Sequence, residues 1–203
     1  MIKIRTIEEL ESERERQFKE WIAAGNDASD FVLNLMGSDL IEADLTGAKL
    51  RGSILYRADL SWANLRNTDL RGAKLTVAKL KWADLKKANL TGAILYRANF
   101  TGSDLYGANL NASDLEGADL TGAKLTGAIL YRADLVEANL SEADLIEADL
   151  TEADLYRADL TGADLYGAKL RGAKIKNTII TQSQYDELDK MYSHEFMSGF
   201  KLE

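Results

Sequence analysis

The sequence predicts an all-β solenoid built from a single five-residue repeat, and three observations support this. Every fifth residue from Leu40 to Ile180 is leucine except Phe100, Ile175 and Ile180, which gives 29 consecutive positions without a slip. The residue two positions before each of these central residues is small, mostly alanine and otherwise serine or threonine. Glycine recurs two positions after the central residue. A five-residue period fits neither an α-helix of about 3.6 residues per turn nor a continuous strand.

Each repeat therefore reads as a short extended segment followed by a corner. The small residue and the leucine are two positions apart, so in an extended segment both point inward. The two residues after leucine then form a turn, and the second of them needs a positive φ in a type II turn, which favours glycine. Twelve repeats carry glycine there. Where Arg57, Trp62 or Glu137 replaces it, we expect a different type of turn.

This repeat unit closely resembles that of the pentapeptide-repeat family. It consists of alanine, then aspartate or asparagine, then leucine and two variable residues. The resemblance covers residues 38–182 without a break. Within the family, the chain is similar to the leucine-centred members found in cyanobacteria. It implies a right-handed quadrilateral β-helix with four repeats in each coil, and so about seven coils from 29 repeats. One column of its structural core would contain Leu40, Leu60, Leu80, Phe100, Leu120, Leu140 and Leu160.

Three parts of the chain follow from this organisation: residues 1–37 as an N-terminal capping helix and lead-in, 38–182 as the β-helix, and 183–203 as a C-terminal helix and tail. The first helix is expected over 7–24, because Thr6 and Glu9 form a capping-box pattern and Gly25 is a stop signal. Arg14 falls within the apolar stripe of this helix. It either lies over the apolar face or makes a buried ion pair or partner contact.

The second helix is expected over residues 183–198. Ser183 would cap it, and Tyr185, Leu188, Tyr192 and Phe196 would share one face. Solenoid ends need covering, because exposed strand edges invite pairing with other chains. This helix therefore either caps the last coil or forms a homodimer contact, and the sequence leaves both open.

The composition excludes several kinds of site. There is no cysteine, which removes disulfides, zinc–thiolate centres, iron–sulfur clusters and a thiol nucleophile. No apolar run approaches the length that spans a membrane, and the first residues lack the apolar stretch of a secretory signal. We therefore expect a cytoplasmic protein that makes no use of a membrane.

Catalysis is not expected either. His194 is the only histidine, is predicted on the polar side of its helix, and has no serine or aspartate arrangement to work with. Aspartates are frequent only because the repeat places them before leucine, and general acid–base chemistry needs a partly desolvated pocket that a convex repeat surface does not offer. The chain contains no phosphate-binding loop, dinucleotide fingerprint or nucleophile elbow. We predict no enzyme activity, no cofactor and no metal.

A candidate interaction surface surrounds Trp62 and Trp82, which lie one coil apart if four repeats make a coil. Paired exposed tryptophans beside lysines are typical of protein interfaces, and aromatic plus basic side chains also suit single-stranded nucleic acid. The third interpretation is that the rings merely stabilise the stack. The nearby lysines are Lys79, Lys81, Lys86 and Lys87.

Charge is segregated along the chain although the net charge is −8. Residues 46–90 carry ten basic and three acidic side chains, whereas residues 111–165 carry three basic and thirteen acidic ones. Within the acidic part, glutamate occupies the same repeat position four times in succession, at Glu137, Glu142, Glu147 and Glu152. Such a band would attract basic surfaces and repel nucleic acid, or would serve only solubility.

These features predict a non-catalytic scaffold that presents charged surfaces to an unidentified protein partner. The alternative comes from the resemblance, since some members of the family protect or inhibit DNA gyrase by imitating the charge of duplex DNA. Against it, the basic part of the chain interrupts a duplex-like field, and phenylalanine occupies the central position only at Phe100. Direct binding of nucleic acid is not expected.

Overall fold

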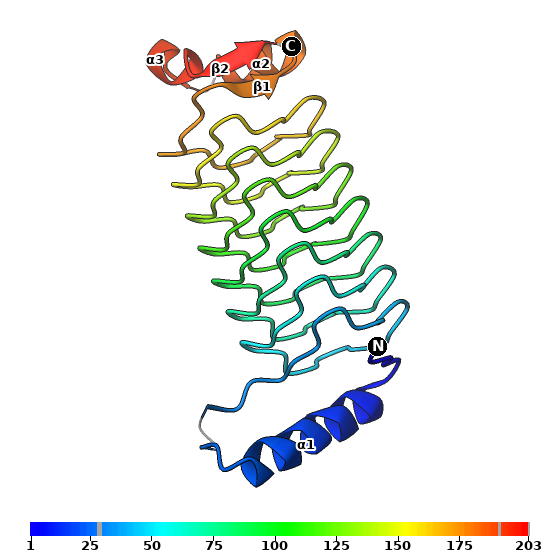
Figure 1. The fold of residues 1–203 in the computed structure, drawn as a ribbon. Helices are drawn as coiled ribbons and strands as arrows, with labels where there is room; N and C mark the ends of the chain where they lie inside the picture. The colour runs from blue at the N-terminus through cyan, green and yellow to red at the C-terminus, as the bar shows by residue number, and fades with distance from the viewer. Residues whose placement is uncertain (28–29, 191, 203) are drawn as a thin grey trace.

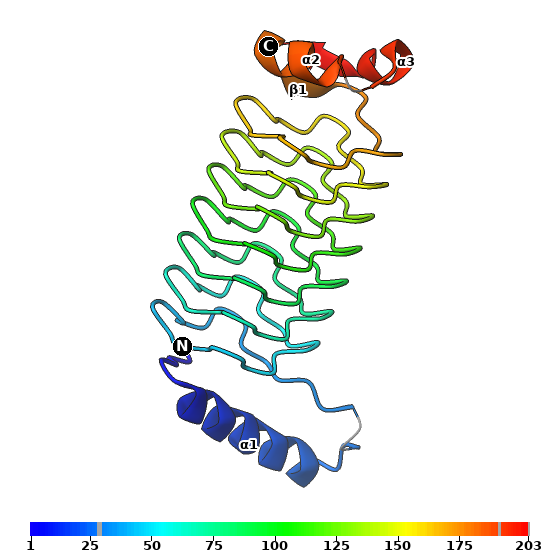
Figure 2. The ribbon, with the colours of Figure 1, turned by 180° about the vertical axis from the view of Figure 1, so that it is seen from behind.

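The computed structural model describes residues 1–27, 30–190 and 192–202. The chain winds into a stack of coils, with helix α1 (Ile7–Ala23) lying across one end (Figure 1). The other end carries strand β1 (Thr178–Ile180), helix α2 (Gln182–Leu188), helix α3 (His194–Met197) and strand β2 (Phe200–Leu202). The view from behind shows the coils lying over one another in the same order (Figure 2).

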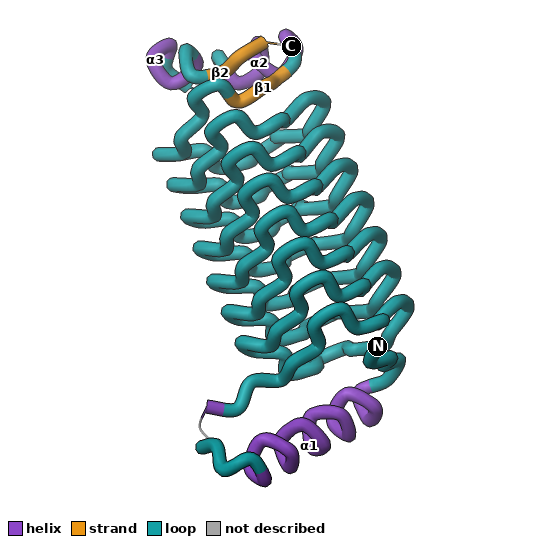
Figure 3. Tube along the Cα trace, viewed as in Figure 1, coloured by secondary structure: helices purple, strands orange, loops and turns teal. Residues whose placement is uncertain are grey.

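A parallel ladder with a constant step joins the coils. The residue before each central leucine pairs with the residue 20 positions later, from Asn34 with Ile54 to Asp159 with Ile179. A coil therefore takes four repeats, as the family resemblance implies, and the ladder starts one repeat earlier than the first predicted one. Each face is extended for only about three residues before it turns, so Figure 3 draws the coils as loops.

The small residues and the leucines fill the interior. Leu60, Phe100 and Leu140 are fully buried, as are the alanines two positions before most of the central residues. The other members of the column named above, also fully buried, are Leu40, Leu80, Leu120 and Leu160. Removing one leucine side chain from water contributes about 1.5–3 kcal/mol before the entropy of ordering is counted.

The hydrogen bonds between coils have a direction. The amide groups of Leu60 and Trp62 donate forward to carbonyl oxygens of the next coil, at 2.7 and 2.9 Å. Only one amide group in the repeat points the other way, such as that of Lys79, which donates back to Ala58 at 2.9 Å. Each repeat thus sends two donors towards the C-terminal end and one towards the N-terminal end. The N-terminal end is left with surplus carbonyl groups, and the C-terminal end with surplus amide groups.

The corners are uniform, which corrects one expectation. Every corner closes with a hydrogen bond such as the one from the Ala63 amide to the Leu60 carbonyl, at 3.1 Å. The second corner residue has a positive φ whatever its side chain: 57° at Arg57, 63° at Trp62 and 56° at Glu137. The different turn expected at these residues is wrong, because the ladder on both sides fixes each corner. Non-glycine residues there carry a strain of about 1–2 kcal/mol.

Aspartate and asparagine before leucine have a structural role in these corners. Their side-chain oxygen accepts a hydrogen bond from the amide two residues later, as from Ile146 to Asp144 at 3.1 Å. At Asp44 the hydroxyl and the amide of Thr46 both donate to the carboxylate, and they lower the pKa of Asp44. The aspartate rows are therefore explained by turn formation.

At the N-terminal end, residues 2–5 add a parallel strand that the sequence analysis did not predict. The Ile4 amide donates to the Asp39 carbonyl at 3.2 Å, and the Asp39 amide donates to Ile2 at 2.8 Å. Helix α1 follows, with the Thr6 hydroxyl accepting from the Glu9 amide.

Only part of the apolar stripe of α1 is buried. Leu10 is fully buried, whereas Ile7, Phe18 and Ile22 are 37%, 37% and 43% exposed. Within the chain, Arg14 does not lie free over this face. It pairs with Glu11 and donates to the Lys49 carbonyl, one of the surplus carbonyls of the first coils.

At the C-terminal end, the single helix expected over residues 183–198 is wrong. Helix α2 is capped by Thr181 and ends at Leu188, and α3 begins only at His194. The chain then returns so that β2 pairs in parallel with β1, with Phe200 opposite Thr178. The break lets β2 reach the open edge of the last coil, which an uninterrupted helix could not do.

Candidate interaction surface

Trp62 and Trp82 form one exposed aromatic stack on the solenoid wall. Their ring centroids are 5.6 Å apart and the ring planes are inclined by 18°. The ladder explains the pairing, because the two residues occupy the same corner in successive coils, spaced by about 4.8 Å. The side chains are nevertheless 59% and 53% exposed. Two large apolar rings, each more than half exposed, therefore lie stacked on the surface of the solenoid.

The stack continues onto a glycine in the next coil. A Cβ atom at Gly102 would lie 2.2 Å from the Trp82 ring, closer than any such contact allows. The ring of Trp82 therefore occupies the space that a side chain at position 102 would take, and Trp62 stacks on Trp82. Because Gly102 has no side chain, the Trp82 ring can pack against it while both rings stay more than half exposed.

Of the four lysines predicted beside the tryptophans, two are neutralised within the chain. Lys79 pairs with Asp59 at 3.1 Å, and Lys86 pairs with Asp104 at 2.9 Å. Lys81 and Lys87 form no ion pair among the described residues. The surface around the stack is thus less basic than the sequence implies.

The four glutamates of the acidic band occupy the four corners of one coil, so the band is a girdle around the solenoid. Glu137 pairs with Arg157 at 3.2 Å, and Glu152 pairs with Arg132 at 2.6 Å. Glu142 and Glu147 lie along glycines of the following coil. A girdle with half of its charge paired differs from the two continuous rows of phosphate on a DNA duplex.

Four tyrosine–arginine pairs at the corners were missed by the sequence analysis. In each, the guanidinium carbon lies 4.9–5.1 Å from the centroid of the preceding tyrosine ring. The positive φ of the arginine lets its side chain fold back over the ring. The signal was available, since the string Leu-Tyr-Arg-Ala occurs four times. The pairs are Tyr56–Arg57, Tyr96–Arg97, Tyr131–Arg132 and Tyr156–Arg157.

Metal-binding clusters and membrane-spanning helices are absent from the part of the chain that the structure describes. No group of three histidine, cysteine, aspartate or glutamate side chains in it could hold a metal ion. No helix in the same residues has the length and apolar character needed to cross a membrane. The side chain of His194 lies outside the described part.

Comparison with sequence families gives one match. The family described as pentapeptide repeats matches in eight copies, and the matched segments together run from residue 34 to residue 177. No curated protein sequence matches the chain.

Several solved structures are similar. HetL, a pentapeptide-repeat protein involved in heterocyst differentiation regulation from the cyanobacterium Nostoc sp. strain PCC 7120, is 39% identical. The match covers 72% of this chain and 76% of HetL, with a TM-score of 0.49. Rfr23, from the cyanobacterium Cyanothece 51142, is 34% identical over 55% of this chain and 84% of its own, with a TM-score of 0.44.

QnrB1, a plasmid-mediated fluoroquinolone resistance protein, is 20% identical, with a TM-score of 0.50 over 78% of this chain and 96% of its own. At this identity the likeness concerns the fold alone. The similar proteins are repeat proteins of the right-handed β-helix type, and no catalytic family is among the matches.

Proposed function

Because the chain belongs to the pentapeptide-repeat family, we propose that it is a non-catalytic scaffold that binds a protein partner through the Trp62–Trp82 stack. The scaffold would be a solenoid of about seven coils, bounded by the terminal segments 1–37 and 183–203, and cytoplasmic. The single observation that carries this proposal is the half-exposed, mutually stacked pair of tryptophan rings.

The surroundings of the stack support a protein partner. Tryptophan is the residue most enriched at the energetic centre of protein interfaces, where it must be surrounded by groups that exclude water. Lys79 and Lys86 already have carboxylate partners within the chain, so a partner need not supply them with counter-ions. A preformed surface of this kind also loses little side-chain entropy on binding.

Replacing both tryptophans by glycine tests the proposal. Glycine occupies this corner position in twelve other repeats and relieves the strain of a positive φ, so we expect the fold to persist. We also expect the W62G/W82G variant to lose the partner that the wild-type protein captures from a native extract, measured by quantitative mass spectrometry. The matched control is E142G/E147G, which makes the same change at two exposed corners and should retain the partner.

The two interpretations of the stack predict different results for this variant. If the rings only stabilise the solenoid, W62G/W82G lowers the unfolding midpoint and the captured proteins stay the same. If they bind a partner, the midpoint is maintained and the partner is lost. Equal capture by both variants and by the wild type would contradict the proposal.

Gyrase binding is the second candidate, and a supercoiling assay with and without a quinolone tests it. The girdle arrangement of Glu137, Glu142, Glu147 and Glu152 favours the scaffold, because its charge surrounds one coil and two of its members are paired. Inhibition or protection of gyrase that E142G/E147G abolishes would instead support the DNA-mimic function.

A further inference from the structure

The last coil of the solenoid leaves part of its outer edge uncovered. Among the described residues, the amide groups of Leu165 and Gly167 donate to no acceptor. In the preceding coil the amide groups at the same two positions donate to carbonyl oxygens at 2.8 and 2.9 Å. The edge is therefore a parallel ladder that stops one strand short, on the end where surplus amide groups accumulate.

The chain itself covers part of the neighbouring edges. On one adjoining face β2 pairs in parallel with β1 and acts as an added strand. On the open face, the Gln184 side chain donates to the carbonyls of Leu160 and Ala163, at 2.7 and 2.9 Å. The outward carbonyl groups are thus satisfied, and only amide donors remain.

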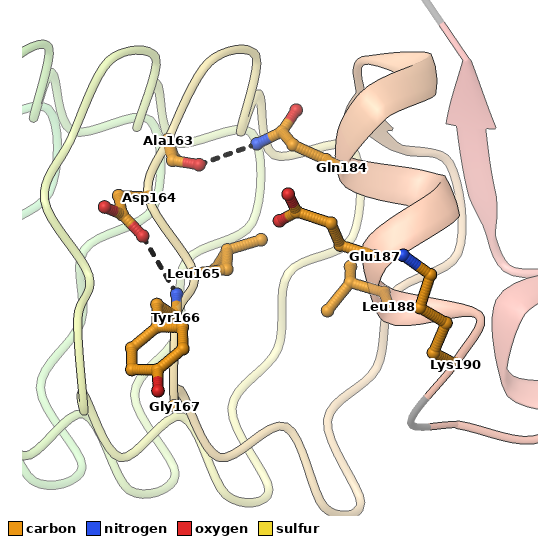
Figure 4. Close-up of a pocket in the computed structure, with 9 residues that line it drawn as sticks. All are labelled: Ala163, Asp164, Leu165, Tyr166, Gly167, Gln184, Glu187, Leu188 and Lys190. Atoms are coloured by element: carbon orange, nitrogen blue, oxygen red, sulfur yellow. Dashed lines mark hydrogen bonds between the residues drawn. The ribbon is translucent and has the colours of Figure 1, made fainter.

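A cavity of about 760 Å³ lies along this edge, between the last coil and α2. Figure 4 shows α2 facing the coil across it, with Gln184 reaching to Ala163. Leu165 is only partly buried, unlike the fully buried leucines of the preceding coils on this face, and Leu188 of α2 lines the same cavity. Tyr166, at the corner, is 78% exposed. The edge therefore combines free backbone donors with an apolar surface.

We propose that an extended segment of a partner protein binds here as an additional parallel strand. Two of its carbonyl groups, two residues apart, would accept hydrogen bonds from Leu165 and Gly167, in the geometry that every preceding coil uses. An apolar side chain between them would enter the cavity against Leu165 and Leu188. Strand addition of this kind uses main-chain hydrogen bonds for affinity and a side-chain pocket for specificity.

A second copy of the chain does not satisfy this edge. In a two-fold symmetric dimer the same edge faces itself, so free amide groups would meet free amide groups. In a head-to-tail arrangement the edge would meet the N-terminal end of another copy. Residues 2–5 and α1 already cover that end. A foreign strand, which supplies carbonyl groups, is the complementary occupant, and its binding site lies apart from the tryptophan stack.

The test uses the full chain and a capped peptide with the sequence of residues 103–109, Ser-Asp-Leu-Tyr-Gly-Ala-Asn, which forms this face in an inner coil. We expect the amide resonances of Leu165 and Gly167 to shift on titration, while amide groups already bonded in inner coils do not. A peptide with serine in place of its leucine is the ligand control. Leu188→Trp, which narrows the cavity, should weaken binding by about tenfold or more.

A spin label keeps the test independent of whether L188W folds normally. The chain has no cysteine, so Tyr166→Cys gives a single attachment point beside the cavity. The label at position 166 should broaden the peptide signals. The matched label from Tyr106→Cys, at the same corner three coils earlier, should broaden them much less. No change at Leu165 and Gly167 with about 1 mM peptide, or equal broadening from both labels, would overturn the proposal. So would concentration-dependent shifts of these amide groups without peptide, which would show self-association.

Discussion

At the N-terminal end of the solenoid the outward backbone groups are mainly carbonyls, whereas at the C-terminal end they are mainly amide groups. The chain covers the first end with donors. Arg5 donates to the Asp39 carbonyl at 2.9 Å, Arg14 donates to Lys49, and the Gln17 amide group exchanges two hydrogen bonds with the Asn34 backbone. Cationic side chains suit this end because they carry donors only.

At the C-terminal end, the covering side chains match the outward backbone groups less well. Gln184 and the Tyr192 hydroxyl supply donors to outward carbonyl groups, although amide groups are in surplus there. Tyr192 also accepts from Leu170, at 3.4 Å, and β2 supplies acceptors on one face. The comparison teaches that a uniform repeat still has two different ends, and that the end with uncovered donors is the one open to a further strand.

The largest expected loss of stability distinguishes the middle of the solenoid from its open C-terminal end. Leu110→Ala removes a fully buried side chain and should lower the free energy of unfolding by about 2–5 kcal/mol. Leu165→Ala, at the partly buried edge, should cost about half as much or less. Urea unfolding followed by circular dichroism measures both. Equal costs would show that the edge is as well packed as the interior.

The next effect compares the two glutamines that cap opposite ends. Gln184 is buried and donates to two carbonyl groups, so Gln184→Ala should cost about 1–3 kcal/mol. Gln17 makes its hydrogen bonds at an exposed site, where water replaces them, so Gln17→Ala should cost clearly less. Gln182→Ala, which loses only an exposed contact to Asp186, is the control. The reverse order would contradict this account of the two ends.

A smaller change in stability is expected for a substitution at an inner corner, and it can test whether the ends of the solenoid open independently of its middle. Val77 is a β-branched residue with a φ of 57° in an inner coil. Val77→Gly should therefore raise the free energy of unfolding by about 1 kcal/mol. Hydrogen exchange should slow in the inner coils and remain unchanged at the bonded amide groups near the C-terminal end, such as those of Leu155 and Arg157, which donate to Lys174 and Lys176 at 2.8 and 3.2 Å. A uniform change along the chain would show that the solenoid unfolds as one unit.

The smallest expected effect is a loss of stability at low pH, and it arises from Asp39 at the N-terminal end. A hydrogen bond from the Ile41 amide, supported by the Arg5 guanidinium, lowers the pKa of Asp39 below its ordinary value. Because the folded pKa is the lower one, this stabilisation is full above about pH 4 and is lost as the pH falls through the folded pKa. The effect is small because the pair is partly exposed.

The pH dependence of urea midpoints between about pH 2 and about pH 5 measures this contribution. Asp39→Asn is the matched variant, because it keeps an oxygen that accepts from Ile41 but carries no charge. It should flatten the part of the pH dependence that the pair contributes. An unchanged profile in the variant would contradict the role given to the Asp39–Arg5 pair.

Much of the fold was predictable because it repeats. The five-residue period, the small residue and the leucine predicted a right-handed β-helix through the family resemblance, and the fold and the family match confirm it. The candidate tryptophans could be placed one coil apart for the same reason. The packing of Trp82 against Gly102 and the ion pairs of Lys79 and Lys86 could not be predicted, because they depend on which residues become neighbours across coils.

The ends were the least predictable part. Ile2 and Ile4 alternate with polar residues, as do Phe200 and Leu202, yet strands of three or four residues give too weak a pattern to identify. Their conformation depends on the open edge they meet, which is far away in the sequence. The break between α2 and α3 has the same origin, since β2 has to reach β1.

The sequence by itself determined what is local and repeated: the inward leucines, the glycine-rich corners and the family. The tertiary structure alone decided what depends on the direction of the ladder and on contacts between coils. Two amide donors point forward in every repeat and one points back, so the two ends differ although the repeats do not. That asymmetry belongs to the backbone of the stacked coils and leaves no trace in the identity of any single residue.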